Sequence, residues 1–174
     1  MTNRHQVRPE LHIRWMIRRD MEEVQAIERA SFHQPWTEAD FISELRERNQ
    51  IGMVAEINGP RVGPIVGFMV YGLFKRHLDI RDFAVDPEHR RHGVGLAMIE
   101  KLTAKLLPQR RTRIRVVQPD SNLDGHLFLR SAGFEAVEIV RGMFEEPDVD
   151  GYLFEYVIPL AVPVSTHNGQ RIHK

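Results

Sequence analysis

The residues best suited to chemistry lie in one short run, Arg90-Arg91-His92-Gly93-Val94-Gly95. Glycine lacks a Cβ, so backbone N–H groups near it can close on a ligand, and the arginines add fixed positive charge and several donors. A helix that begins at this point would leave its first N–H groups without partners, and such groups attract anions. The run therefore predicts a phosphate or pyrophosphate site. A tight turn with exposed arginines is the alternative interpretation of the loop alone.

The flanking residues predict the elements that would position this run. Ile80 to Val85 is apolar and β-branched enough for a strand, and Asp86-Pro87 ends it because proline cannot continue a central ladder. After the glycines, apolar residues recur at helical spacing from Val94 to Leu107, and Pro108 stops the pattern. We therefore expect a strand, a glycine-containing loop and a helix in immediate succession.

The loop resembles the acyl-CoA pyrophosphate loop of the GNAT superfamily of N-acetyltransferases, whose pattern is Arg/Gln-X-X-Gly-X-Gly/Ala. Ala84-Val85-Asp86-Pro87 is similar to the end of that family's fourth strand, and Ser131-Ala132-Gly133-Phe134 resembles its second signature, a helix that ends in Gly-Phe. The resemblance extends from about Leu11 to Leu160 and includes the element order β-α-α-β-β-β-α-β-α-β-β. It implies an α/β (α+β) fold with a central mixed, mostly antiparallel sheet of six to seven strands. About four helices would flank the sheet, and its fourth and fifth strands would splay apart.

The resemblance also implies that acetyl-CoA is the acyl donor. In this family the pantetheine arm pairs with the free edge of the fourth strand, so Phe83, Ala84 and Val85 are expected beside it. The Val85 N–H would then polarise the thioester carbonyl. The remaining residues implied as acetyl-CoA contacts are Arg90, Arg91, His92, Gly93, Val94, Gly95, Leu96, Ala97, Asn122 and Arg130.

A second segment narrows the resemblance within the superfamily. Pro35-Trp36-Thr37, between two short predicted helices, resembles the ribosomal-protein-alanine N-acetyltransferase (RimI-like) branch. In that branch the segment walls the peptide side of the site. The residues therefore expected to contact the acceptor are His33, Trp36 and Glu38.

The proton-handling positions depart from this branch. Aligned on Gly133-Phe134, the usual glutamate base falls at Val117 and the usual tyrosine acid at Leu129, and neither side chain carries a proton. Asp79 is the candidate base, because many relatives have a glutamate at the start of the fourth strand. Tyr152 is the candidate acid or substrate-orienting hydroxyl. The alternative interpretations are a surface carboxylate for the aspartate and a core aromatic residue for the tyrosine.

Four further expectations concern the surroundings of these residues. Arg81 is expected to give Asp79 a low pKa, and strand alternation places Asp82 on the opposite face of the strand. A helix from about Leu123 to Ser131 is expected to bury Leu127, Phe128 and Ala132. His126 on that helix is expected to face solvent.

Composition excludes several classes of function. The chain has 174 residues, and 24 basic residues balance 24 acidic ones, so no overall positive field favours nucleic acid. The basic run 109–113 is accordingly interpreted as a solvated loop. Without cysteine there is no disulfide, thiolate nucleophile or cysteine-bound zinc, and the scattered histidines lack metal-binding spacing, so no metal is expected. No apolar run reaches the roughly 18 residues of a membrane helix, which favours a cytoplasmic protein without membrane contact.

One domain is expected at 11–160, preceded by a flexible stretch at 1–10 and followed by a disordered tail at 161–174. The oligomeric state is expected to be a monomer or a homodimer.

The favoured function is an acetyl-CoA-dependent N-acetyltransferase that acts on a protein N-terminal α-amine. An acetyltransferase for small amines or lysine is the first alternative, because the acidic loop 142–151 would suit any cationic acceptor. A non-catalytic acyl-CoA-binding module is the second, because of Val117 and Leu129.

Overall fold

The computed structural model describes residues 10–59, 63–144 and 149–159. Its strands are β1 (Leu11–Trp15), β2 (Gln50–Ile57), β3 (Ile65–Leu73), β4 (His77–Val85), β5 (Arg113–Pro119), β6 (Glu135–Val140) and β7 (Gly151–Val157). Its helices are α1 (Met21–Ser31), α2 (Glu38–Arg46), α3 (Val94–Thr103) and α4 (Leu123–Ser131), with short 3-10 turns η1 (Arg18–Asp20) and η2 (Pro87–His89). Residues 1–9 and 160–174, on which the expectations of a flexible start and a disordered tail fall, lie outside the described residues.

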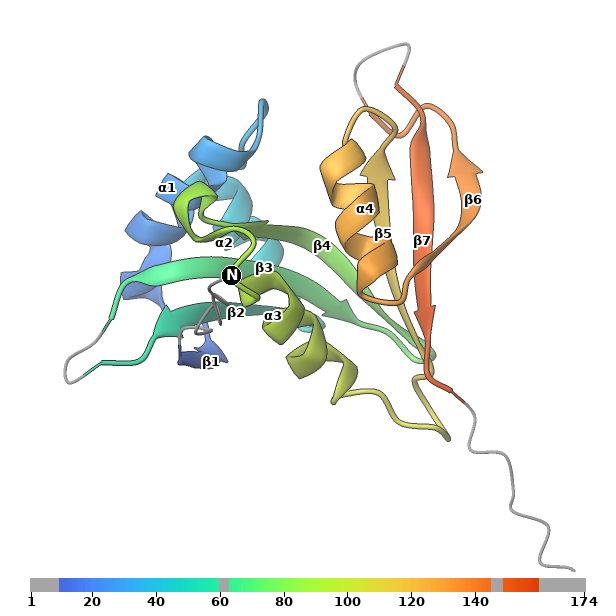
Figure 1. The fold of residues 1–174 in the computed structure, drawn as a ribbon, viewed down its shortest axis with the longest axis horizontal. Helices are drawn as coiled ribbons and strands as arrows, with labels where there is room; N and C mark the ends of the chain where they lie inside the picture. The colour runs from blue at the N-terminus through green and yellow to red at the C-terminus, as the bar shows by residue number, and fades with distance from the viewer. Residues whose placement is uncertain (1–9, 60–62, 145–148, 160–174) are drawn as a thin grey trace, which may run out of the picture.

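The seven strands form one mixed sheet in the order β1-β2-β3-β4-β5-β7-β6. Every neighbouring pair is antiparallel except β4 and β5, which run parallel because α3 crosses over between them. These two strands pair only from His77 opposite Arg113 to Ile80 opposite Val116, although both continue beyond that point. Figure 1 shows the result, a sheet that opens like a V between β4 and β5. The expected fold and the splay are confirmed.

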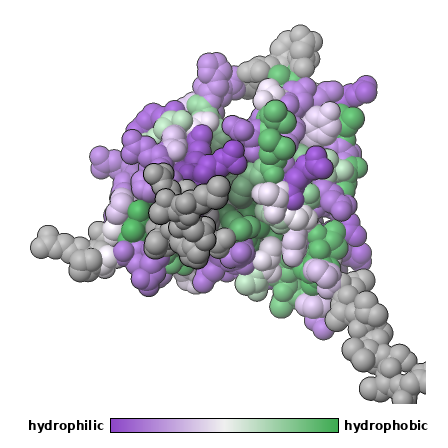
Figure 2. Space-filling view, in the orientation of Figure 1, coloured by the Kyte–Doolittle hydropathy of each residue, from purple (hydrophilic) through white to green (hydrophobic). Residues whose placement is uncertain are grey.

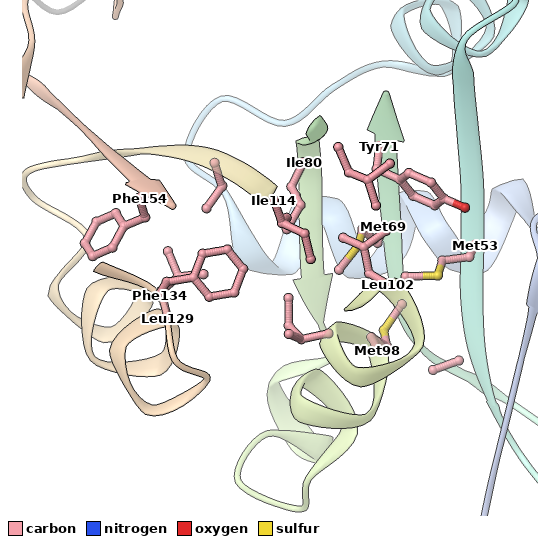
Figure 3. Packing of buried hydrophobic residues seen from close by; sticks show 14 of the residues in the cluster. Met53, Met69, Tyr71, Ile80, Met98, Leu102, Ile114, Leu129, Phe134 and Phe154 are labelled. Atoms are coloured by element: carbon pink, nitrogen blue, oxygen red, sulfur yellow. The ribbon is translucent and has the colours of Figure 1, made fainter. Parts of the chain in front are cut away.

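Helices cover both faces of the sheet and bury a separate apolar cluster on each. On one face, Met98 and Leu102 of α3 and Leu129 of α4 pack against strand residues that include Met69 and Ile114 (Figure 3). On the other face, α1 and α2 supply the buried residues Val24, Ile27 and Phe41, which pack against Val54, Phe68 and Val70. Burial of such side chains contributes about 1.5–3 kcal/mol each. The two clusters fix β4 in the centre of the molecule.

The end of one helix differs from expectation. The helix predicted over 94–107 ends at Thr103, and two tight turns follow, in which Lys105 N–H donates to Leu102 O and Leu106 N–H to Thr103 O, both at 3.0 Å. These turns return Leu106 to the core, where it is 8% exposed, so the apolar pattern outlasts the helix.

No helix in the described part of the chain is long and apolar enough to cross a membrane.

Candidate functional site

Beyond Ile80 and Val116, β4 and β5 separate and leave a gap between them. The edge of β4 that faces this gap is formed by the backbone of Phe83 and Val85. Asp86 N–H donates to Val66 O on β3 at 2.9 Å, and backbone groups alternate direction along a strand. Ala84 therefore also bonds towards β3, whereas the N–H and C=O groups of Phe83 and Val85 point to the side that β5 has left. This arrangement leaves strand-pairing groups for an extended guest at the centre of the sheet.

The loop below the gap opens α3 without a side-chain cap. Gly93 is the N-cap residue, with a φ of 84°, and it makes no side-chain hydrogen bond to the first turn. Arg91 has a φ of 64°, a left-handed conformation that is uncommon outside glycine and marks a strained turn. The first N–H groups of the helix consequently face outward from a positive helix end, as an anion site requires.

Arg90 and His92 are engaged within the loop. Arg90 Nε donates to Val85 O at 3.0 Å and its Nη2 donates to Ser31 Oγ at 3.0 Å, so this guanidinium braces β4 against the end of α1. His92 Nδ1 lies 2.7 Å from Arg90 O. Both residues remain predicted phosphate contacts, but Arg90 also holds the strand edge in place.

Gly95 allows a close approach of α3 to its neighbours. A Cβ at this position would lie 3.1 Å from the Phe128 ring and 3.5 Å from the Phe83 ring. Those two rings are 5.8 Å apart between centroids and join β4 to α4 beneath the gap. Val94, which is buried, and the half-buried Leu96 and Ala97 complete the first turn of the helix.

The β5 side of the gap carries Asn122, Tyr152 and His126. Asn122 caps α4 by accepting a bond from Gly125 N–H at 3.0 Å, and its Nδ2 donates to Gln118 Oε1 at 2.7 Å. Tyr152 lies on β7 opposite Gln118, and its ring meets His126 edge-on at 5.5 Å. Asn122 and Tyr152 thus both lie beside Gln118 near the end of β5, and their roles stay predictions.

Two expectations about α4 are wrong. His126 is half-buried, its Nε2 lies 2.9 Å from Pro119 O, and its ring also contacts Phe154 at 5.1 Å. Leu127 is 54% exposed, whereas Leu129 is 3% exposed and lies in the core beside Phe134 (Figure 3). Figure 2 shows hydrophobic side chains gathered over α4. The buried face of α4 therefore differs from the predicted one, and Leu129, which has no hydroxyl, packs in the core. Arg130, a predicted phosphate contact, is exposed.

Asp79 lies at the base of the gap, on β4 opposite Arg115 of β5. Its carboxylate is 3.6 Å from Arg81 Nη1, which also approaches α2 because Arg81 Nε donates to Glu44 Oε1 at 3.0 Å. Burial nevertheless raises the pKa of Asp79, and the charge of Arg81 only partly offsets it. The expected low pKa is therefore wrong, because desolvation outweighs the ion pair.

A bulge in β4 reverses the expected direction of Asp82. Val70 pairs with Asp82 and Tyr71 with Ile80, so Arg81 is the extra residue. Ile80 therefore packs in the cluster under α3, while Ala84 packs in the cluster under α1 and α2. Asp82 faces α1 on the same side of the sheet as Asp79, contrary to the alternation argument.

Asp82 meets Glu28 of α1 in a buried acid pair that the sequence analysis missed. The two residues are 9% and 1% exposed, and Asp82 Oδ2 and Glu28 Oε2 have no partner among the described residues. Burial and then the charge of Glu28 raise the pKa of Asp82 to about 8, and burial raises the pKa of Glu28. Two adjacent carboxyls in a dry site hold a shared proton more easily than two charges. Only a contact between residues far apart in the sequence could reveal this pair.

The segment Pro35-Trp36-Thr37 is hydrogen-bonded to this acid pair. Trp36 N–H donates to Glu28 Oε1 at 2.8 Å, and the Trp36 ring packs edge-on against Phe41 at 5.3 Å. His33 and Glu38 on either side are exposed. Trp36 is therefore held by a buried anchor, while its two predicted companions are free to contact solvent or substrate.

These features match a known family. The sequence model of the Acetyltransferase (GNAT) family matches residues 21–134. The chain belongs to the GNAT family. It is accordingly an acetyltransferase, and acetyl-CoA is the acyl donor that this family uses. Within the described residues, no group of three His, Asp or Glu side chains is placed to hold a metal ion.

Relatives of known name agree with this assignment. The ribosomal protein bS18-alanine N-acetyltransferase of Escherichia coli K12 is 27% identical over 139 residues, which are 80% of this chain and 88% of that protein. Its solved structure matches with a TM-score of 0.73 at 22% identity, covering 89% of this chain and 98% of that one. Ard1 from Thermoplasma volcanium gives a TM-score of 0.75 at 24% identity, covering 86% and 99%. Arabidopsis thaliana NAA60, solved with acetyl-CoA, gives 0.73 at 16% identity, covering 86% and 100%.

Proposed function

We propose that this GNAT protein transfers the acetyl group of acetyl-CoA to the α-amine at a protein N-terminus. The observation that carries the proposal is the gap between β4 and β5, with the backbone of Phe83 and Val85 on its edge and an uncapped helix start below. The choice of acceptor rests on the named E. coli relative and on the Pro35-Trp36-Thr37 segment beside the gap.

The residues present fit acetyl-CoA. Phe83 offers an N–H and a C=O group and Val85 offers its N–H to the amide groups of the pantetheine arm, while Val85 O accepts a hydrogen bond from Arg90 Nε. Gly93, Val94 and Gly95 offer N–H groups to the pyrophosphate, and Arg91 adds positive charge. Asn122 and Arg130 on α4 are the proposed contacts on the opposite wall.

Acetyl transfer requires a new C–N bond, loss of the C–S bond and two proton movements. When bound, acetyl-CoA supplies the activated acetyl thioester. Asp79 accepts the proton that the attacking ammonium must lose, and its raised pKa brings it closer to the operating range of a base. The Val85 N–H stabilises the developing oxyanion. The Tyr152 hydroxyl donates a proton to the departing thiolate, and solvent restores it.

The test is a CoA-release assay with purified protein and acetyl-CoA. Peptides with a free α-amine should give turnover, and blocking that amine should abolish it even when a lysine side chain remains. Turnover only with lysine or small amines would overturn the proposed acceptor, but acetyl transfer from acetyl-CoA to an amine would still hold. Acetyl-CoA binding by calorimetry without turnover on any amine would instead identify a binding module, with Val117 and Leu129 as its explanation.

A further inference from the structure

A second concave site lies at the end of β4 and β5 opposite the gap. A cavity of about 590 Å³ opens there, and its charged lining consists of Lys75, Arg76, His77, Arg110, Arg113 and Arg115. His77 and Arg113 are the first residues of β4 and β5, whereas the gap opens at the carboxyl ends of these strands. At about 3.3 Å per residue, the length of β4 puts roughly 26 Å between His77 and Val85, whereas Arg115 of the lining lies opposite Asp79 at the base of the gap.

The lining is strongly positive in a protein whose overall charge is zero. Five of its residues carry fixed positive charge, and Glu155 of β7 is the carboxylate that pairs with them. Glu155 lies 2.7 Å from Arg115 Nε and 3.4 Å from Arg113 Nη1. Within residues 10–59, 63–144 and 149–159, Lys75, Arg76 and Arg110 take part in no ion pair. Like charges gathered without counter-ions repel one another, and a bound anion relieves that cost.

The walls of the cavity are fixed by hydrogen bonds between two segments. Arg111 Nε donates to Phe74 O at 2.7 Å and Thr112 N–H donates to Arg76 O at 3.2 Å, which ties the β3–β4 turn to the segment before β5. Glu155 orients the two strand arginines, as described above. The basic run 109–113 therefore contributes Gln109, Arg110, Thr112 and Arg113 to the lining of the cavity.

We propose that this cavity binds a small anion that carries two or more phosphate groups. Its volume lies within the range of small-molecule sites, about 300–1,000 Å³. Guanidinium groups match phosphate oxygens with paired donors, and the five fixed positive charges of the lining exceed the single charge of Glu155 by four. Burial, followed by the charge of Arg115, lowers the pKa of His77, which leaves this side chain a neutral partner for a hydroxyl or phosphate oxygen.

The test is calorimetric titration of the full chain with inorganic tripolyphosphate, with and without saturating acetyl-CoA. We expect one tripolyphosphate per chain, bound also when acetyl-CoA occupies the loop at α3. An equimolar titration with inorganic phosphate should give much weaker binding, because one phosphate reaches fewer of the arginines.

Paired variants assign the binding to the cavity. Arg76→Ala/Arg110→Ala should weaken tripolyphosphate binding at least tenfold, because both side chains are exposed lining residues. Arg29→Ala/Lys101→Ala removes the same charge from exposed positions on α1 and α3 and should leave affinity within twofold. Thermal unfolding midpoints of both variants should match the wild type.

Three outcomes would overturn the proposal. Displacement of tripolyphosphate by acetyl-CoA would place it at the α3 loop, and equal weakening in both double variants would mean general charge attraction. Tighter binding of a single-stranded RNA than of tripolyphosphate, lost in Arg76→Ala/Arg110→Ala, would identify an RNA surface instead of a small-molecule site. None of these results depends on turnover with any amine.

Discussion

At the scale of single residues, two carboxyls on β4 have different environments although both face α1 and α2. Asp79 is partly exposed at the base of the gap, with Arg81 beside it. Asp82 is buried against Glu28, with no cation in contact among the described residues. The first is therefore suited to exchange protons with a substrate, and the second to retain one.

Asp79→Asn should lower kcat/KM about 100-fold at pH 7, within the usual contribution of a general base. Because the base must be ionised, the wild-type rate should rise with pH through the raised pKa of Asp79. The variant should lose that rise, as measured by CoA release from pH 4 to 8. Asp124→Asn, at an exposed position of α4, is the control and should match the wild type. An unchanged pH profile in Asp79→Asn would assign the base elsewhere.

Asp82→Asn should change how stability depends on pH. A raised carboxyl pKa means that the folded chain keeps a proton that the unfolded chain releases above about pH 4. Wild-type stability contributed by this group should therefore fall from about pH 4 until the pKa of about 8 and then level off.

Urea unfolding of wild type and Asp82→Asn at pH 5 and pH 8 measures this effect. At pH 8 the variant should gain stability relative to the wild type. Glu28→Gln should weaken the dependence of stability on pH in the same way, since either change removes the acid pair. Parallel curves for all three proteins would show that the two carboxyls do not share a proton.

At the scale of elements, α3 and α4 meet beneath the gap through a close contact at Gly95. In Gly95→Ala the new Cβ would press on Phe128 at 3.1 Å, which should destabilise the fold by about 1 kcal/mol. Adding Phe128→Leu removes the obstructing ring atoms, so the double variant should lose less than the sum of the single losses. Chemical unfolding of the four proteins completes this cycle, and strict additivity would contradict the packing argument.

At the scale of the whole molecule, acetyl-CoA should bridge the two arms of the V. Hydrogen exchange resolved by residue should show the amides of Phe83 and Val85 gaining protection when acetyl-CoA binds. The amide of Ala84 should change little, because it already points to β3. Global stability should rise by about 2.7 kcal/mol at a ligand concentration 100 times Kd. Equal protection at all three residues would argue against strand-like binding.

The sequence by itself determined the parts that depend on neighbours in the chain. The strand, loop and helix around Gly93 follow from local apolar spacing, a proline and the missing Cβ of glycine. The start of α2 is equally local: Thr37 and Asp40 form a capping box, in which Asp40 N–H donates to Thr37 Oγ1 and Thr37 N–H donates to Asp40 Oδ2. Together with the Gly-Phe signature, these patterns were enough to predict the family and the fold.

Only the tertiary structure decided the features that depend on contacts between distant segments. The bulge at Arg81 arises from pairing with β3, and it turned Asp82 towards Glu28, 54 positions away in the sequence. The buried face of α4 and the basic cavity likewise depend on packing between separate elements. A raised pKa requires burial, and burial is a property of the folded chain, so the balance of charges at Asp79 could not be read from Arg81 alone.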